Sequence, residues 1–294
     1  MATMLSITNP GEKVVIFSPF YENYGADTIL SGAEPIYVPL VPPEFHFDKE
    51  KLEDAFRQGA KALILCNPSN PCGKVFTMEE MQTIAELAKK YDAYVVTDEV
   101  YEHIVYAPNK HIYMQALEGM RERTIVCNSL SKTYSITGWR LGYVIANPQI
   151  IDRVKKVHDF LTVGAAAPLM EAAVVGLEFG DGYYDELAAH YAHMKEVFVG
   201  GLKKLGLKYT DPQGAYYVLV DVSEFGVKDD VKFCEWMTQF VGVAAVPGSS
   251  FFREDVHNLV RFHFAKQDDT LNEAIKRLAT LKEKVMNAKN VDWR

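Results

Sequence analysis

The stretch SLSKTYSITGWRLGY, Ser129 to Tyr143, places Lys132 between small hydroxyl residues and the triplet Gly138-Trp139-Arg140. An apolar run from Leu141 to Ala146 overlaps its end and is typical of a buried strand. Such a loop presents one amine, several hydroxyl groups and one guanidinium to a single small anionic ligand. Those are the groups required to hold a phosphorylated aldehyde as an imine.

Short apolar runs alternate with amphipathic segments around this stretch. We expect strands over residues 13–17, 34–38, 61–66, 93–97, 124–127 and 141–146, and helices over 48–58 and 77–91. Asp48 caps the first of these helices, and Thr77 with Glu80 forms a capping box at the second. Strand–helix–strand units of this length predict an α/β fold, with a mostly parallel sheet between two layers of helices.

The second half of the chain changes to an α+β pattern. We expect helices over residues 148–160, 168–179, 185–205, 229–240 and 268–286, and strands over 215–220 and 259–264. We therefore divide the chain into a large domain, residues 1–180, and a smaller C-terminal domain, residues 181–294.

Composition excludes several classes of protein. The net charge of −8, without an offsetting basic run, argues against nucleic acid or a membrane surface as a partner. The four cysteines, Cys66, Cys72, Cys127 and Cys234, lack metal-type spacing and are too few for a disulfide framework in 294 residues. No apolar run reaches the roughly 18–20 residues of a membrane span. We therefore expect a cytoplasmic protein with reduced thiols and no bound metal.

Five motifs follow one another along the chain. They are Asn-Pro-x-Asn-Pro-x-Gly from Asn67, Asp-Glu-x-Tyr from Asp98, Ser-x-Ser-Lys from Ser129, Gly-Trp-Arg from Gly138, and Arg-Phe from Arg261. In order and approximate spacing they resemble the motifs of class I and II aminotransferases, which depend on pyridoxal phosphate. The resemblance covers essentially the whole chain. It implies the type I fold of pyridoxal-phosphate enzymes, a three-layer α/β/α large domain followed by a small α+β domain.

The resemblance implies which residues surround the ring of pyridoxal 5′-phosphate. Lys132 forms the Schiff base and later acts as general base and acid, and Asp98 pairs with the pyridine nitrogen. Asp98 suits this task because it ends a predicted strand, where open α/β sheets bind ligands. Asn70 and Tyr101 bind the ring oxygen, and Tyr101 belongs with Lys132 and Asp98 to the catalytic set. Tyr21 stacks on the ring.

The resemblance also implies the residues at the two ends of the site. Ser129 and Arg140 bind the phosphate. Arg261 pairs with the α-carboxylate of the substrate, assisted by Asn70, because a guanidinium fork binds a carboxylate bidentately. Cys72 departs from the family, which usually has a small residue such as threonine there, and we expect little effect.

Simpler structural readings stay open for most of these residues. They are a helix cap for Asp98, a turn residue for Asn70, core aromatics for Tyr21 and Tyr101, a loop hydroxyl for Ser129 and a surface ion pair for Arg140.

The function that the resemblance implies is transfer of an amino group from an amino acid to a 2-oxo acid by a homodimer. The same residues support β-elimination from sulfur amino acids or racemisation, because these reactions share a carbanion. A binding or regulatory protein that senses cofactor or amino acid is the alternative from another class. In the family, a substrate-covering arm and a phosphate-binding helix precede the position of Asn9. Because the sequence begins at Met1, inside the large domain, we expect weak cofactor binding and slow transamination.

Overall fold

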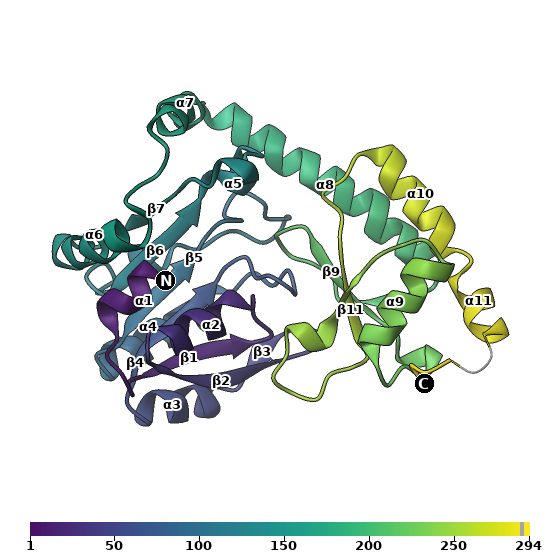
Figure 1. Ribbon diagram of the computed structural model, residues 1–294, viewed down its shortest axis with the longest axis horizontal. Coiled ribbons are helices and arrows are strands. Elements are labelled where there is room, and N and C mark those ends of the chain that lie inside the picture. The colour runs from purple at the N-terminus through teal and green to yellow at the C-terminus, as the bar shows by residue number, and fades with distance from the viewer. Residues whose placement is uncertain (289–290) are drawn as a thin grey trace.

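The computed structural model describes residues 1–288 and 291–294 and contains a larger and a smaller β-sheet (Figure 1). The larger sheet has the strand order β3-β2-β1-β4-β5-β6-β7. Its strands are β1 (Lys13–Ser18), β2 (Glu34–Val41), β3 (His46–Phe47), β4 (Ala60–Cys66), β5 (Tyr94–Asp98), β6 (Thr124–Ser129) and β7 (Gly142–Ile145). Strands β2, β1, β4, β5 and β6 run parallel to one another, whereas β3 and β7 are antiparallel edges. The predicted α/β class and mostly parallel sheet are therefore confirmed.

The first seven α-helices of the chain belong to the same part of the molecule as this sheet, and some of them cover its two faces. They are α1 (Ala2–Ile7), α2 (Asn23–Leu30), α3 (Lys49–Arg57), α4 (Met78–Lys90), α5 (Leu130–Thr133), α6 (Pro148–Thr162) and α7 (Ala167–Leu177). Helices α3 and α4 pack on one face, where Val15 and Leu63 are fully buried. Helices α1 and α6 pack on the other face, against Val14 and Ile64. Strands buried on both sides read as continuous apolar runs, which is why they were recognisable in the sequence.

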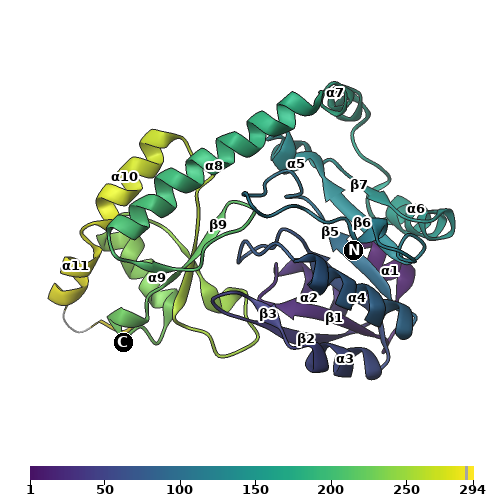
Figure 2. The ribbon, with the colours of Figure 1, turned by 180° about the vertical axis from the view of Figure 1, so that it is seen from behind.

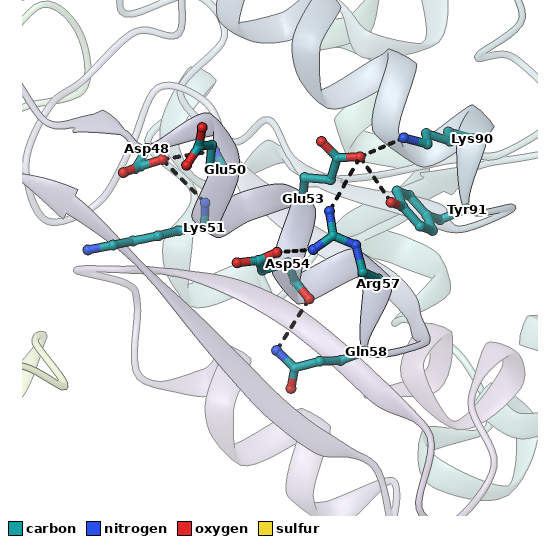
Figure 3. A network of polar contacts seen from close by, with 9 residues as sticks. All are labelled: Asp48, Glu50, Lys51, Glu53, Asp54, Arg57, Gln58, Lys90 and Tyr91. Atoms are coloured by element: carbon teal, nitrogen blue, oxygen red, sulfur yellow. Dashed lines mark hydrogen bonds and ion pairs between the residues drawn. The ribbon is translucent and has the colours of Figure 1, made fainter.

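Polar contacts explain where α3 begins and how α3 is held against the end of α4 (Figure 3). Asp48 accepts hydrogen bonds from two backbone N–H groups in the first turn of α3, so the predicted cap is confirmed. Glu53 on α3 accepts from Lys90 Nζ at 2.6 Å and from the Tyr91 hydroxyl at 3.0 Å, which ties α3 to the end of α4. Arg57 pairs with Asp54 on the same helix.

The smaller sheet has the order β10-β11-β9-β8 and is antiparallel throughout. Its strands are β8 (Lys208–Tyr209), β9 (Tyr217–Asp221), β10 (Val246–Pro247) and β11 (Leu259–His263). The helices around it are α8 (Asp181–Lys204), α9 (Asp230–Phe240), α10 (Asp268–Leu278) and α11 (Leu281–Asn287). Short 3-10 helices lie at Met114–Ala116, Thr137–Trp139, Ser223–Phe225 and Gly248–Ser250.

Helix α8 links the two parts of the molecule. In Figures 1 and 2 it runs from α7, beside the larger sheet, to α10 at the far end of the smaller one. Near its start the Tyr183 hydroxyl donates to the Thr133 carbonyl at 2.7 Å, whereas Met194 and Phe198 lie in the core of the smaller sheet. The division of the chain at residue 180 stays a prediction.

The prediction of one closing helix over 268–286 is wrong, because the chain bends between α10 and α11. The Thr280 hydroxyl and its N–H both bond to the Arg277 carbonyl, at 2.8 and 3.0 Å, and this ends the helical ladder of α10. Leu278 before the bend and Leu281 after it both lie in the core. The sequence reading also omitted α2. In the described part of the chain, no helix combines the length and the apolar composition that crossing a membrane requires.

Candidate functional site

A cavity of about 580 Å³ lies at the carboxyl ends of β4, β5 and β6 and is closed on one side by β9 and β11. All eight residues predicted from the sequence line it: Tyr21, Asn70, Asp98, Tyr101, Ser129, Lys132, Arg140 and Arg261. Seven residues that were not predicted also line it: Glu22, Tyr24, Cys66, Val100, Ser131, Thr137 and Tyr217. This convergence follows from the parallel sheet, whose strand ends open on one side into the loops that carry the motifs.

Lys132 lies in α5, the short helix that follows β6. Its Nζ is 5.8 Å from the ring centroid of Tyr216. Among the described residues, none forms a hydrogen bond or ion pair with this amine. The lysine is therefore held at the cavity by its helix and by an aromatic face, with its nitrogen available to a ligand.

Asp98 ends β5 and receives two hydrogen bonds. The Tyr24 hydroxyl donates to Oδ2 at 2.6 Å, and the backbone N–H of Val100 donates to Oδ1 at 3.2 Å. Burial raises the pKa of the Asp98 carboxyl, while these two hydrogen bonds and the charge of Lys132 oppose the rise. Burial thus disfavours the charged form of Asp98, while the hydrogen bonds and the charge of Lys132 stabilise it. Tyr24 was missed from the sequence, although an aromatic three residues after Tyr21 was a usable signal.

Arg261 on β11 reaches across to the larger domain. Its Nη1 donates to Asn70 Oδ1 at 2.6 Å, a contact between residues 191 positions apart. Its guanidinium lies between two rings, 4.4 Å from the centroid of Tyr217 and 4.2 Å from that of Phe251. Burial lowers the pKa of Arg261. A desolvated guanidinium packed against two aromatic rings in this way is arranged to pair with an anion.

Two tyrosines predicted near the ring occupy different environments. Tyr101 is buried, and its hydroxyl lies 3.0 Å from that of Tyr217. Burial raises the pKa of Tyr101, so its hydroxyl stays protonated and can donate. Tyr21 is 37% exposed and meets Tyr24 edge-on, with ring centroids 5.7 Å apart. Its ring is at the cavity wall, and its stacking on a ligand stays a prediction.

Ser129 and Arg140 flank the start and the end of the lysine loop. The Ser129 hydroxyl accepts from the backbone N–H of Ser131 at 3.1 Å and so caps α5, and it lies 2.7 Å from the Ser131 hydroxyl. Arg140 has a left-handed backbone conformation, φ 57°, and its Nη1 donates to the Thr137 carbonyl at 2.9 Å. Arg140 also lines the cavity. The loop thus offers three hydroxyl residues and one cation at one end of the cavity.

The sequence matches one protein family and is similar to several known proteins. Residues 1–278 match the family described as aminotransferase class I and II. A probable N-succinyldiaminopimelate aminotransferase, DapC, of Mycobacterium tuberculosis is 35% identical over 96% of this chain and 74% of its own length. Kynurenine–oxoglutarate transaminase 3 of Rattus norvegicus is 34% identical over 91% of this chain and 66% of its own length.

Solved structures agree with the sequence comparison. The structure of YbdL from Escherichia coli, for which a methionine aminotransferase function was identified, superimposes with a TM-score of 0.91. It is 32% identical and covers 95% of this chain, which in turn covers 74% of that structure. A likeness of this extent confirms the predicted fold, the α/β/α domain followed by a smaller α+β domain.

Proposed function

Because this chain belongs to the class I and II aminotransferase family, whose members use pyridoxal 5′-phosphate, we propose that the cavity around Lys132 binds this cofactor and is the site of amino transfer. The substrates of such an enzyme are an amino acid and a 2-oxo acid. The observation that supports the proposal most is the convergence on one cavity of all eight residues that the family resemblance implied, with the Lys132 amine unpaired in the described chain.

The groups in the cavity fit the cofactor chemically. An aldehyde requires an unpaired amine, which Lys132 has. A pyridine nitrogen requires a buried carboxylate, which Asp98 supplies with Tyr24 holding it in place. A phosphate requires a cation and hydroxyl groups, and Arg140 lies beside Ser129 at one end of the cavity. The donor set therefore matches the ligand at each of its three functional groups.

The residues of this chain can be given the following tasks. When bound, the cofactor supplies a sink for the electrons released at the α-carbon of the donor. Arg261 binds the donor's α-carboxylate through its fork, and Asn70, already bonded to Arg261, orients it. Asp98 keeps a proton on the pyridine nitrogen. Lys132, as a free amine, acts first as general base and removes the proton from the α-carbon, and then acts as general acid and donates the proton again.

We also propose that the protein is a homodimer. Helices α6 and α7 and the turn between them carry apolar side chains in the open: Phe160 is 91% exposed, Val163 82% and Val175 62%. Large apolar side chains exposed to this extent favour a surface that another element covers. A second copy of this chain fits, since symmetric dimers are the commonest soluble assemblies.

The four cysteines are all unpaired, three of them buried, which supports a cytoplasmic location.

The test of the cofactor site is a chemical label. Purified protein is mixed with pyridoxal phosphate, reduced with borohydride and digested, and we expect the cofactor's mass on the peptide that contains Lys132. A panel of amino acids with a 2-oxo acid acceptor then measures transfer. Release of pyruvate and ammonia without an acceptor would identify β-elimination instead. A label on another lysine, or none at saturating cofactor, would refute the site.

A further inference from the structure

Glu22 lines the cavity but has no task in the function proposed above. It follows Tyr21 in the loop after β1 and occupies the capping position of α2, yet its side chain makes no cap hydrogen bond. It is exposed, and it forms no ion pair with any residue that the structure describes. A capping residue normally satisfies the first N–H groups of its helix with its side chain. The Glu22 carboxylate instead does not bind its own helix and remains available at the cavity.

The charges around the cavity can be matched to ligand groups one by one. Five charged side chains line it: Glu22, Asp98, Lys132, Arg140 and Arg261. Under the proposed function, the last four face the pyridine nitrogen, the aldehyde, the phosphate and the α-carboxylate. The remaining carboxylate has no partner on the cofactor. The part of the substrate still without a partner is its side chain.

Two observations place Glu22 at the substrate end of the cavity. It lines the same cavity as Arg261, next in sequence to the lining residue Tyr21. Its negative charge is also felt by Arg261: burial lowers the pKa of that guanidinium, and the charge of Glu22, after the Tyr217 hydroxyl, is among the groups that oppose the fall. Glu22 therefore lies within electrostatic reach of the residue proposed to hold the α-carboxylate.

We propose that Glu22 determines which donor side chains the enzyme accepts, favouring side chains that end in N–H groups and disfavouring side chains that end in a carboxylate. This inference rests on the proposed function. A carboxylate accepts hydrogen bonds from amine or amide N–H groups, and it repels a second carboxylate where the cavity walls exclude part of the water. Selection by repulsion is a common source of specificity, because it weakens the wrong ligand without strengthening contacts to the right one.

Glutamate and glutamine form the sharpest pair of donors for a test, because they have the same shape and differ in one charge. The variant Glu22→Gln keeps the size of the side chain and removes its charge. We expect it to raise kcat/KM for glutamate relative to glutamine by about tenfold, mostly through KM. The variant Glu34→Gln is the matched control, since Glu34 is an exposed glutamate at the start of β2, at the amino ends of the parallel strands, whereas the cavity lies at their carboxyl ends. Its ratio should equal that of the wild type.

Equilibrium binding gives a second readout that needs no turnover. Glutarate and glutaramate differ by the same charge and cannot react, so their dissociation constants can be compared by calorimetry on the cofactor-loaded protein. Glu22→Gln should tighten glutarate about tenfold relative to glutaramate. If both ligands tighten equally, Glu22 only competes for Arg261, and the inference is wrong. If both ratios stay at the wild-type value in a folded variant, it is wrong as well. Absence of transfer with any donor would reject the proposed function, while the binding ratio would still decide the role of Glu22.

Discussion

Two effects act in opposite directions on the pKa of the Asp98 carboxyl group. Burial at the end of β5 raises its pKa, and the hydrogen bonds from Tyr24 and from the backbone of Val100 counteract the rise. Because the folded-state pKa is raised, the neutral form stabilises the fold at acid pH, and this contribution is lost as the pH increases through the folded pKa. Tyr24 thus acts on the site through Asp98 and is a positioning residue.

The variant Tyr24→Phe tests this arrangement. It removes a hydrogen bond to the charged form of Asp98, so the pKa of that carboxyl should rise further. A hydrogen bond to a charged group is worth about 1.5–3 kcal/mol, which corresponds to a shift of about one to two pH units. We expect the acidic limb of the kcat/KM profile to move to higher pH by that amount. Tyr209→Phe, on β8, is the control; an unmoved profile in Tyr24→Phe would separate Tyr24 from the chemistry.

Arg261→Lys tests the substrate end of the cavity. A lysine retains the positive charge but replaces a planar fork, held between Tyr217 and Phe251, with a single point of contact. We expect donor binding to weaken by about 1.5–3 kcal/mol, seen as a higher KM for every amino acid in the panel. Affinity for pyridoxal phosphate, measured by absorbance titration, should change little. Loss of cofactor with retained donor affinity would show that Arg261 belongs to the cofactor's end of the site.

At the scale of elements, the helices of the large domain begin where their caps are. Thr77 accepts from the backbone N–H of Glu80 at 3.2 Å, and the Glu80 side chain accepts from the backbone N–H of Thr77 at 2.9 Å, which completes the predicted capping box of α4. Glu80 also binds the buried Lys74 at 2.8 Å. One residue therefore joins the start of α4 to the loop that follows β4 and carries Asn70.

The variant Thr77→Ala should destabilise the protein by about 1 kcal/mol, because the backbone N–H of Glu80 at the start of α4 loses the hydroxyl that accepts its hydrogen bond. Urea unfolding measures this change. Donor kcat/KM should be preserved, since Thr77 lies outside the cavity. Glu79→Ala, an exposed change in the first turn of the same helix, serves as the control. Equal midpoints for the two variants would mean that the cap contributes nothing.

At the scale of the whole molecule, two features depend on assembly. The first is the cavity, which is lined by residues of both sheets, since Tyr217 on β9 and Arg261 on β11 face the strand ends of the larger sheet. The second is the set of exposed apolar side chains on α6 and α7. Helix α7 lies beside the start of α8 (Figure 1). A charge introduced on that surface should disturb a partner and leave the fold intact.

Val175→Glu tests the homodimer in this way. We expect the wild type to sediment as a dimer and the variant as a monomer, or as a dimer with a much weaker dissociation constant. Met286→Glu, a change at a 77% exposed side chain on α11, is the control and should sediment like the wild type. A wild type that is monomeric at every concentration would contradict the proposal.

The sequence by itself determined the parts of this protein that depend on local order. The buried strands, the caps at Asp48 and Thr77 and the five motifs were recognisable because each rests on residues a few positions apart. They predicted the fold class and the eight residues that line the cavity, whose individual roles stay predictions. Only the tertiary structure decided contacts between distant segments: the Tyr24–Asp98 hydrogen bond spans 74 positions and the Arg261–Asn70 bond 191. The antiparallel β7, the bend before α11 and the place of Glu22 are of the same kind. Each depends on contacts between segments that are distant in the sequence, and a local sequence pattern does not specify its distant partner.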